Sequence, residues 1–166
     1  MQYANADFKD VPQIVELCQS GFPYLKNTNL LTKLFELYAK RGILIVAKTD
    51  RVIGYIAARP NLTFFKDAFK MRPSLLLPGR LGFITPWHLR LLFAKGAYLA
   101  SMSVEPEFRG QGVANSLMQL AMQRLEQKEI FVEIEGDNDP MGKIVQKLGF
   151  TRLITFFSGR ELWCKS

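Results

Sequence analysis

The sequence predicts a single mixed α/β domain built on a mixed central sheet. Its 166 residues fall within the ~100 to 200 residues typical of one domain. Hydrophobic residues make up 48% of the chain and charged residues 22%, a balance that excludes disordered, collagen-like and coiled-coil proteins. A helical stretch separates the strands expected at 98–104 and 130–135, and such a crossover requires a parallel strand pair.

Five elements are expected before residue 60. In chain order they are a strand, two helices and a two-stranded hairpin, at 2–5, 8–19, 30–40, 43–47 and 52–58. Asp7 is a good N-cap for the first helix, and Asp10 suits its first turn. Gly42 ends the second helix, whose apolar residues recur at helical spacing.

Six elements are expected after residue 95, and they place helices on both faces of the sheet. They are a strand, a helix, a strand, a helix and a closing hairpin, at 98–104, 112–127, 130–135, 141–148, 153–157 and 161–164. The last helix is expected to bury Met141, Ile144, Val145 and Leu148, and the hairpin turns at Ser158 and Gly159.

Composition excludes several kinds of site. Cys18, Cys164 and the single His88 are too few for a four-ligand zinc site without carboxylates or for a disulfide scaffold, so no metal is expected. Asp7, Lys9 and Asp10 interrupt the apolar core that a signal peptide needs, which favours the cytoplasm. The uncharged stretches are shorter than the ~18 to 20 residues of a transmembrane span.

Positive charge is concentrated in residues 60–95, which carry +5 of the overall +7. Six aromatic residues are interleaved with these cations. Three interpretations are open: stacking on nucleic acid bases, contact with anionic lipid, and a solvated cationic rim over the core. Since the segment exceeds the ~12 to 15 residues of an ordinary long loop, we expect a functional insertion.

The chemistry is expected in residues 104–114, which join a strand to a helix. Gly110 and Gly112 let a ligand approach the backbone closely, and the first turn of the helix presents unpaired N–H groups to an anion. A diphosphate suits such a site. The two glycines alone are a weak signal, because they also suit a tight turn.

The flanking residues resemble the signature of the GNAT superfamily of N-acetyltransferases. Arg109, Gly112 and Ala114 match its pattern of Arg or Gln, two residues, Gly, one residue, then Gly or Ala. Asn138 and the residues at 147–150 are similar to its second motif. The resemblance covers residues 97–157 well and 1–58 weakly, while 60–95 exceeds the usual connection.

The resemblance implies acetyl transfer from acetyl-CoA to a primary amine. It also implies that the parallel strands splay apart to admit the pantetheine arm. The residues expected to bind the cofactor are Met102, Val104, Arg109, Gly110, Gln111, Gly112, Val113, Ala114 and Asn138.

The catalytic groups are less clearly marked. Val145 stands where the family commonly has a proton-donating tyrosine, so Tyr98, Tyr24 or water must protonate the departing thiolate. Glu133 and Glu135 share one strand face and are candidate bases, and Ser103 is placed to hold a water. We select Tyr98, Ser103 and Glu135 as the catalytic candidates.

Other functions stay open. The buried valine is also consistent with a CoA-binding module without turnover, and the basic aromatic segment with a nucleic-acid or membrane-surface binder. If the chain is an enzyme, the positive segment favours an anionic acceptor, small molecule or peptide, over a polyamine. The sequence is compatible with a monomer or a homodimer.

Overall fold

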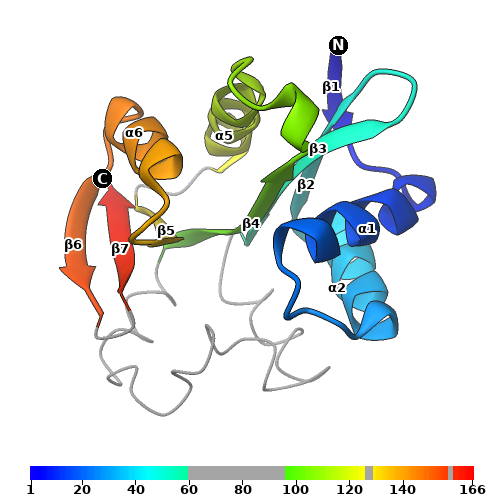
Figure 1. Cartoon of the computed structure of the whole chain (residues 1–166), viewed down its shortest axis with the longest axis horizontal. Helices are drawn as coiled ribbons and strands as arrows, with labels where there is room; N and C mark the ends of the chain where they lie inside the picture. The colour runs from blue at the N-terminus through cyan, green and yellow to red at the C-terminus, as the bar shows by residue number, and fades with distance from the viewer. Residues whose placement is uncertain (60–95, 126–128, 157–158) are drawn as a thin grey trace. The chain divides into compact units, whose positions relative to one another are not determined.

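The computed structural model describes residues 1–59, 96–125, 129–156 and 159–166, and the expectations for the insertion at 60–95 lie outside this part. The chain forms two compact units (Figure 1). The first comprises Met1–Ala58 and Ala100–Arg124, and the second Arg59–Leu99 and Leu125–Ser166.

The strands follow the order β1-β2-β3-β4-β5-β7-β6. Their bounds are Gln2–Asn5 for β1, Ile43–Lys48 for β2, Val52–Arg59 for β3, Ala97–Val104 for β4, Ile130–Glu135 for β5, Thr151–Thr155 for β6 and Arg160–Lys165 for β7. The β4–β5 pair is parallel, whereas the β1–β2, β2–β3, β5–β7 and β6–β7 pairs are antiparallel. The predicted mixed sheet is therefore confirmed.

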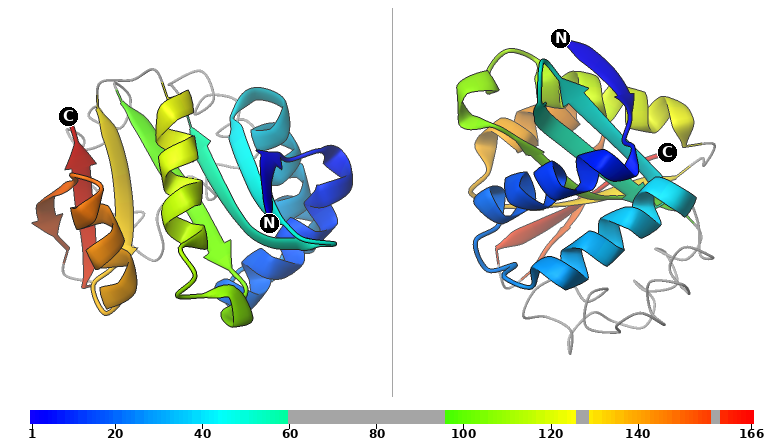
Figure 2. Two further views of the ribbon diagram at one scale, coloured as in Figure 1. Left: turned by 90° about the horizontal axis from the view of Figure 1, so that it is seen from above. Right: turned by 90° about the vertical axis from the view of Figure 1, so that its right-hand side faces the viewer.

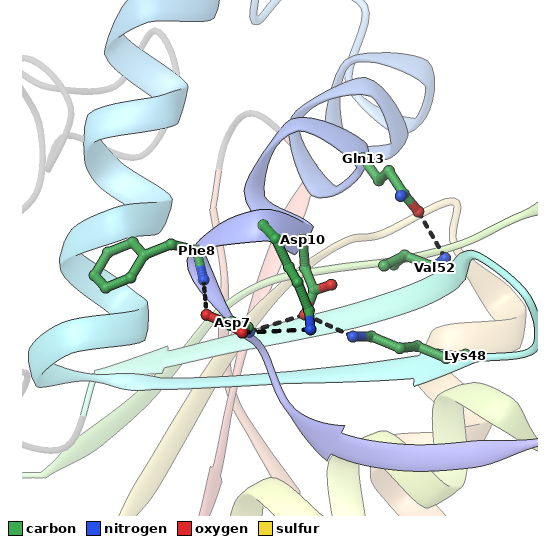
Figure 3. A network of polar contacts seen from close by, with 7 residues as sticks. Asp7, Phe8, Asp10, Gln13, Lys48 and Val52 are labelled. Carbon is green, nitrogen blue, oxygen red and sulfur yellow. Dashed lines mark hydrogen bonds and ion pairs between the residues drawn. The ribbon is translucent and has the colours of Figure 1, made fainter.

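The start of the first predicted helix differs from the sequence expectation. Residues Phe8–Asp10 form a 3₁₀ turn, η1, and the α-helix α1 runs over Val11–Gly21. The Asp10 carboxylate accepts a hydrogen bond from the Asp7 N–H at 2.8 Å and pairs with the Lys48 ammonium at 2.7 Å (Figure 3). This buried carboxylate closes a capping box around η1, so the tighter turn precedes α1.

Two helical layers cover opposite faces of β3 in the first unit. A methyl group added to Gly54 would lie 3.3 Å from Val113 at the start of α5 (Val113–Arg124). The next residue, Tyr55, packs its ring edge-on against Phe35 of α2 (Thr28–Arg41), with centroids 5.3 Å apart. Because consecutive strand residues face opposite ways, α5 lies on one side and the α1–α2 pair on the other (Figure 2).

The second unit contains the parallel pair and the C-terminal hairpin. β4 pairs with β5 from Ala97↔Ile130 to Leu99↔Val132, and no further. The last helix, α6, spans Asp139–Lys147 and begins before the predicted residue 141, because Pro140 fits its first turn.

Other boundaries also differ from the predictions; α1 ends at Gly21 rather than 19, and α2 begins at Thr28 rather than 30. β6 begins at Thr151 rather than 153, and α5 ends at Arg124 rather than 127. The predicted ends at 127 and 157, and the turn residue Ser158, lie outside the described residues.

Candidate active site

The turn between β4 and α5 has the conformation that the glycine pattern predicts. Gly110 has φ 75° and Gly112 has φ 83°, a left-handed backbone that favours glycine. A Cβ atom at either position would meet nothing within 4 Å. Space therefore exists for a ligand beside both glycines.

The start of α5 presents free backbone donors to that space. Among the described residues, the N–H groups of Gly112, Val113 and Ala114 have no hydrogen-bond acceptor. The Val113 side chain is buried, so only its backbone is available here. These donors, together with the positive end of the helix dipole, suit an anion such as the diphosphate of CoA.

Arg109 and Gln111 hold the turn in place through their side chains. The Arg109 Nε donates to the Val104 carbonyl at 3.0 Å, and the Gln111 Nε2 donates to the Glu107 carbonyl at 3.0 Å. Both side chains are exposed. Each therefore supports the shape of the site, and the remaining guanidinium N–H groups of Arg109 stay available to an anion.

The residues of β4 that were expected to contact the cofactor and the water lie on different faces. Val104 faces α5, since its Cγ2 would lie 3.3 Å from a methyl group on Gly54, and Met102 shares that face by alternation. The Ser103 hydroxyl instead lies against the end of α1, 2.7 Å from where a Cβ of Gly21 would stand. Ser103 therefore lies on the opposite face of β4 from Met102 and Val104.

Glu105 has a largely buried side chain although it lies in a turn. It follows β4, and its N–H donates to the Ile53 carbonyl at 2.9 Å. Its carboxylate pairs with the Arg51 guanidinium at 2.5 Å, and the side chain is only 15% exposed. Glu105 therefore fixes the end of β4 to the β2–β3 turn.

In the second unit, Tyr98 is packed under an arginine. The Arg59 guanidinium carbon lies 4.4 Å from the centre of the Tyr98 ring, a cation–π contact. The ring also borders the buried pair Phe131 and Leu162. Tyr98 is therefore a partly buried member of the core.

Glu133 and Glu135 share one arginine, Arg160. The Arg160 Nη1 lies 3.0 Å from Glu133 and its Nη2 lies 3.4 Å from Glu135. The Glu133 side chain is 7% exposed and the Glu135 side chain 54%. Burial raises the pKa of Glu133, although Arg160 and Arg59 oppose the shift. Of the two carboxylates, Glu133 is the more buried, whereas the sequence prediction selected Glu135.

Asn138 and Val145 belong to α6. Asn138 is its N-cap, and the side-chain oxygen accepts from the Met141 N–H at 3.2 Å. This leaves the side-chain NH₂ for a ligand. Val145 is fully buried, so the position where the family commonly has a tyrosine faces the core.

The structure brings the candidates together in two groups. The first unit holds Met102, Val104 and the turn from Arg109 to Ala114, with Ser103 on the other face of β4. The second unit holds Tyr98, Glu133, Glu135 and Asn138.

The sequence did not identify three arginines of the site, Arg51, Arg59 and Arg160. Each contacts a residue of another strand or turn, and the strand register accounts for the contact between Glu135 and Arg160. Alternation within single strands could not identify these partners.

Neither a metal site nor a membrane span is found in the described ranges. No group of three or more His, Cys, Asp or Glu side chains there could hold a metal ion. None of the helices in this part of the chain has the length and apolar character to cross a bilayer.

Several solved structures share the fold. Ribosomal-protein-alanine N-acetyltransferase from Brucella melitensis has a TM-score of 0.72 at 16% identity, over 99% of both chains. The yncA protein of Salmonella typhimurium, solved with its cofactor acetyl-CoA, has a TM-score of 0.68 at 16% identity, over 99% of this chain and 92% of that one. A chain of the NatC complex bound to Gag peptide and CoA has a TM-score of 0.67 at 16% identity, over 99% and 96%.

A family model identifies the chain more directly than these distant structures. No match was found among the curated proteins. The model described as "Acetyltransferase (GNAT) family" matches residues 11–150, which include the glycine turn, the first turn of α5 and Asn138. The chain therefore belongs to the acetyltransferase (GNAT) family.

Proposed function

We propose that this chain transfers an acetyl group from acetyl-CoA to a primary amine. The observation that carries the proposal is the pair of left-handed glycines before α5, each open to a ligand and followed by free N–H groups. Membership of the family supplies the reaction class. When bound, acetyl-CoA supplies an activated acyl group on a thioester.

The first unit provides the binding groups. The N–H groups from Gly110 to Ala114 bind the diphosphate, and Arg109 adds a charged donor. Met102 and Val104 contribute the strand along which the pantetheine arm lies, with unpaired groups because β4 pairs with β5 only as far as Leu99. In the second unit, Asn138 keeps a side-chain NH₂ that is available to a ligand.

Proton transfer is assigned to side chains of β4 and β5. The amine must lose a proton to attack, and a carboxylate of β5, Glu135 or the more buried Glu133, accepts it directly or through a water. The Tyr98 hydroxyl, or water, returns a proton to the departing thiolate.

Calorimetric titration with acetyl-CoA tests the binding site. Gly112→Asp puts bulk and negative charge at the donor end of α5, and we expect at least about a hundred-fold weaker binding from losing charge-assisted hydrogen bonds. Gly159→Asp is the matched control, because Gly159 has φ 81° and the same open surroundings in the second unit. Equal affinities of the two folded variants would contradict the assigned site.

A binding module without turnover is the second candidate. It is favoured by Val145, which is fully buried and carries no hydroxyl. Release of free CoA thiol in the presence of a panel of amines distinguishes the two candidates. An enzyme releases thiol with at least one amine and produces the acetylated amine in equal amount, whereas a binding module does neither.

A further inference from the structure

Tyr55 of β3 links three elements of the first unit through its hydroxyl. The residue is fully buried, and its hydroxyl lies 2.7 Å from the Ser101 hydroxyl on β4. Burial raises the pKa of the Cys18 thiol of α1, and the Tyr55 and Ser101 hydroxyls oppose the shift. Phenylalanine would fill the same volume with no polar group to satisfy, so the hydroxyl pair is a directional link between β3 and β4.

The link lies on one face of β4. Ser101 is on the Tyr55 face of the strands, and Ser103, two residues further along, shares that face by alternation. Met102 and Val104 therefore lie on the opposite face, where Val104 lies beside Gly54 on the α5 side.

β4 is the hydrogen-bonded neighbour of β3. Its parallel pairing with β5 ends at Leu99, so residues 100–104 depend on β3 for their position. The Tyr55–Ser101 bond adds a side-chain link to that strand pair, and the Arg109 bond to the Val104 carbonyl holds the end of β4.

We propose that Tyr55 is a positioning residue that holds residues 100–104 of β4 against β3, so that Met102 and Val104 face α5. A slip by one residue would turn both side chains to the opposite face. The consequence for catalysis rests on the proposed function, because these two residues belong to the assigned acetyl-CoA site. The positioning itself is a property of the free protein.

Tyr55→Phe and Ser101→Ala, alone and together, test the proposal. The first readout is hydrogen exchange of the backbone amides of residues 100–104 without ligand, and the second is the KM for acetyl-CoA. We expect each single variant to exchange about three- to ten-fold faster, the effect of one hydrogen bond, and to raise that KM. The double variant should be no worse than either, because both remove the same bond.

Two further variants separate positioning from a general loss of stability. Phe35→Leu alters the ring that packs against Tyr55 and leaves the hydroxyls in place, so it should lower stability without changing the exchange of 100–104 relative to the rest of the first unit. Ser101→Thr retains a hydroxyl and should keep the exchange of the unmodified protein.

The exchange measurement decides the proposal. Unchanged protection of residues 100–104 in Tyr55→Phe, or the same pattern in Phe35→Leu at equal loss of stability, overturns it. If Tyr55→Phe does not fold, Ser101→Ala carries the test, since it leaves the buried ring intact. Failure of the unmodified protein to bind acetyl-CoA would instead refute the proposed function, and the exchange result would stand.

Discussion

Glu133 illustrates at the scale of a single residue how a neighbour from another strand sets the chemistry. Strand alternation predicts that Glu133 and Glu135 share a face, and the register confirms it, since they lie beside Leu162 and Arg160 of β7. Alternation could not show which carboxylate is buried. Which carboxylate is buried is decided by tertiary packing. The arginines that oppose the pKa shift of Glu133, Arg160 and Arg59, belong to strands remote in the sequence.

The raised pKa of Glu133 predicts a pH dependence of stability. Because burial raises the pKa in the folded state above its value in the unfolded chain, the folded state binds more protons, and the free energy of unfolding falls as pH rises through this range. Glu133→Gln should remove this fall, worth about 1.4 kcal/mol for each pKa unit. Urea unfolding at several pH values between the acid range and neutrality measures it.

Glu135→Gln is the control for this prediction. Its carboxylate contacts the same arginine but is largely exposed, so its removal should leave the pH dependence in place. If Glu135→Gln removed the pH dependence of stability as well, the effect would come from pairing with Arg160 rather than from the burial of Glu133.

The helix α6 shows, among the elements, what sequence patterns predict and what they miss. Its existence and its buried residue Val145 follow from apolar spacing, and both are confirmed, whereas Met141, Ile144 and Leu148 are only partly buried. Its start was predicted two residues late, because the apolar pattern does not mark a cap whose bond is made by Asn138. Helix ends depend on such single hydrogen bonds, whereas helix interiors depend on a repeated pattern.

Val145→Tyr is expected to destabilise the protein rather than to restore a proton donor. A valine that is fully buried leaves no room for a phenol, and overpacking costs about 1 to 3 kcal/mol. Gln146→Tyr, at the exposed neighbouring position, is the control and should leave stability unchanged. Thermal unfolding and thiol release are the measurements. A stable Val145→Tyr variant with faster turnover would contradict the expectation.

Asn138 allows the structural and the binding role of one side chain to be separated. Asn138→Ala removes the cap and should cost about 1 kcal/mol. Asn138→Asp keeps a capping oxygen but loses the NH₂ group, so it should retain stability while binding acetyl-CoA more weakly. Unfolding curves and calorimetric titration of both variants give the answer. Full affinity for acetyl-CoA in Asn138→Asp would show that Asn138 acts only as the N-cap of α6.

On the scale of the whole molecule, sequence patterns predicted most strands and helices and the reaction class. The division of the described chain into two compact units was not foreseen, because it follows from long-range contacts around β4 that no local pattern carries. The family model covers both units. What distinguishes this chain from the family pattern is the insertion at 60–95, which lies outside the described residues.

Replacing residues 60–95 by a short Gly-Ser linker tests the role assigned to the insertion from its charge. If this +5 segment selects anionic amines, the shortened protein should bind acetyl-CoA normally, because Gly110 and Gly112 are untouched, and should lose its preference among acceptors. Competition between acidic and polycationic amines, read by mass spectrometry, measures the preference. An intact protein that acetylates spermidine better than acidic amines would contradict the assignment.

The division into two units also determines what optical probes report. The two stretches that form the first unit contain no tryptophan, while Trp163 of β7 donates from its indole nitrogen to Glu161 at 3.1 Å in the second. Tryptophan fluorescence therefore follows unfolding of the second unit, and the alkaline titration of buried Tyr55, whose pKa burial raises well above its ordinary value, follows the first. If the two signals change together, the two units unfold as one cooperative molecule. If they change separately, the units unfold independently.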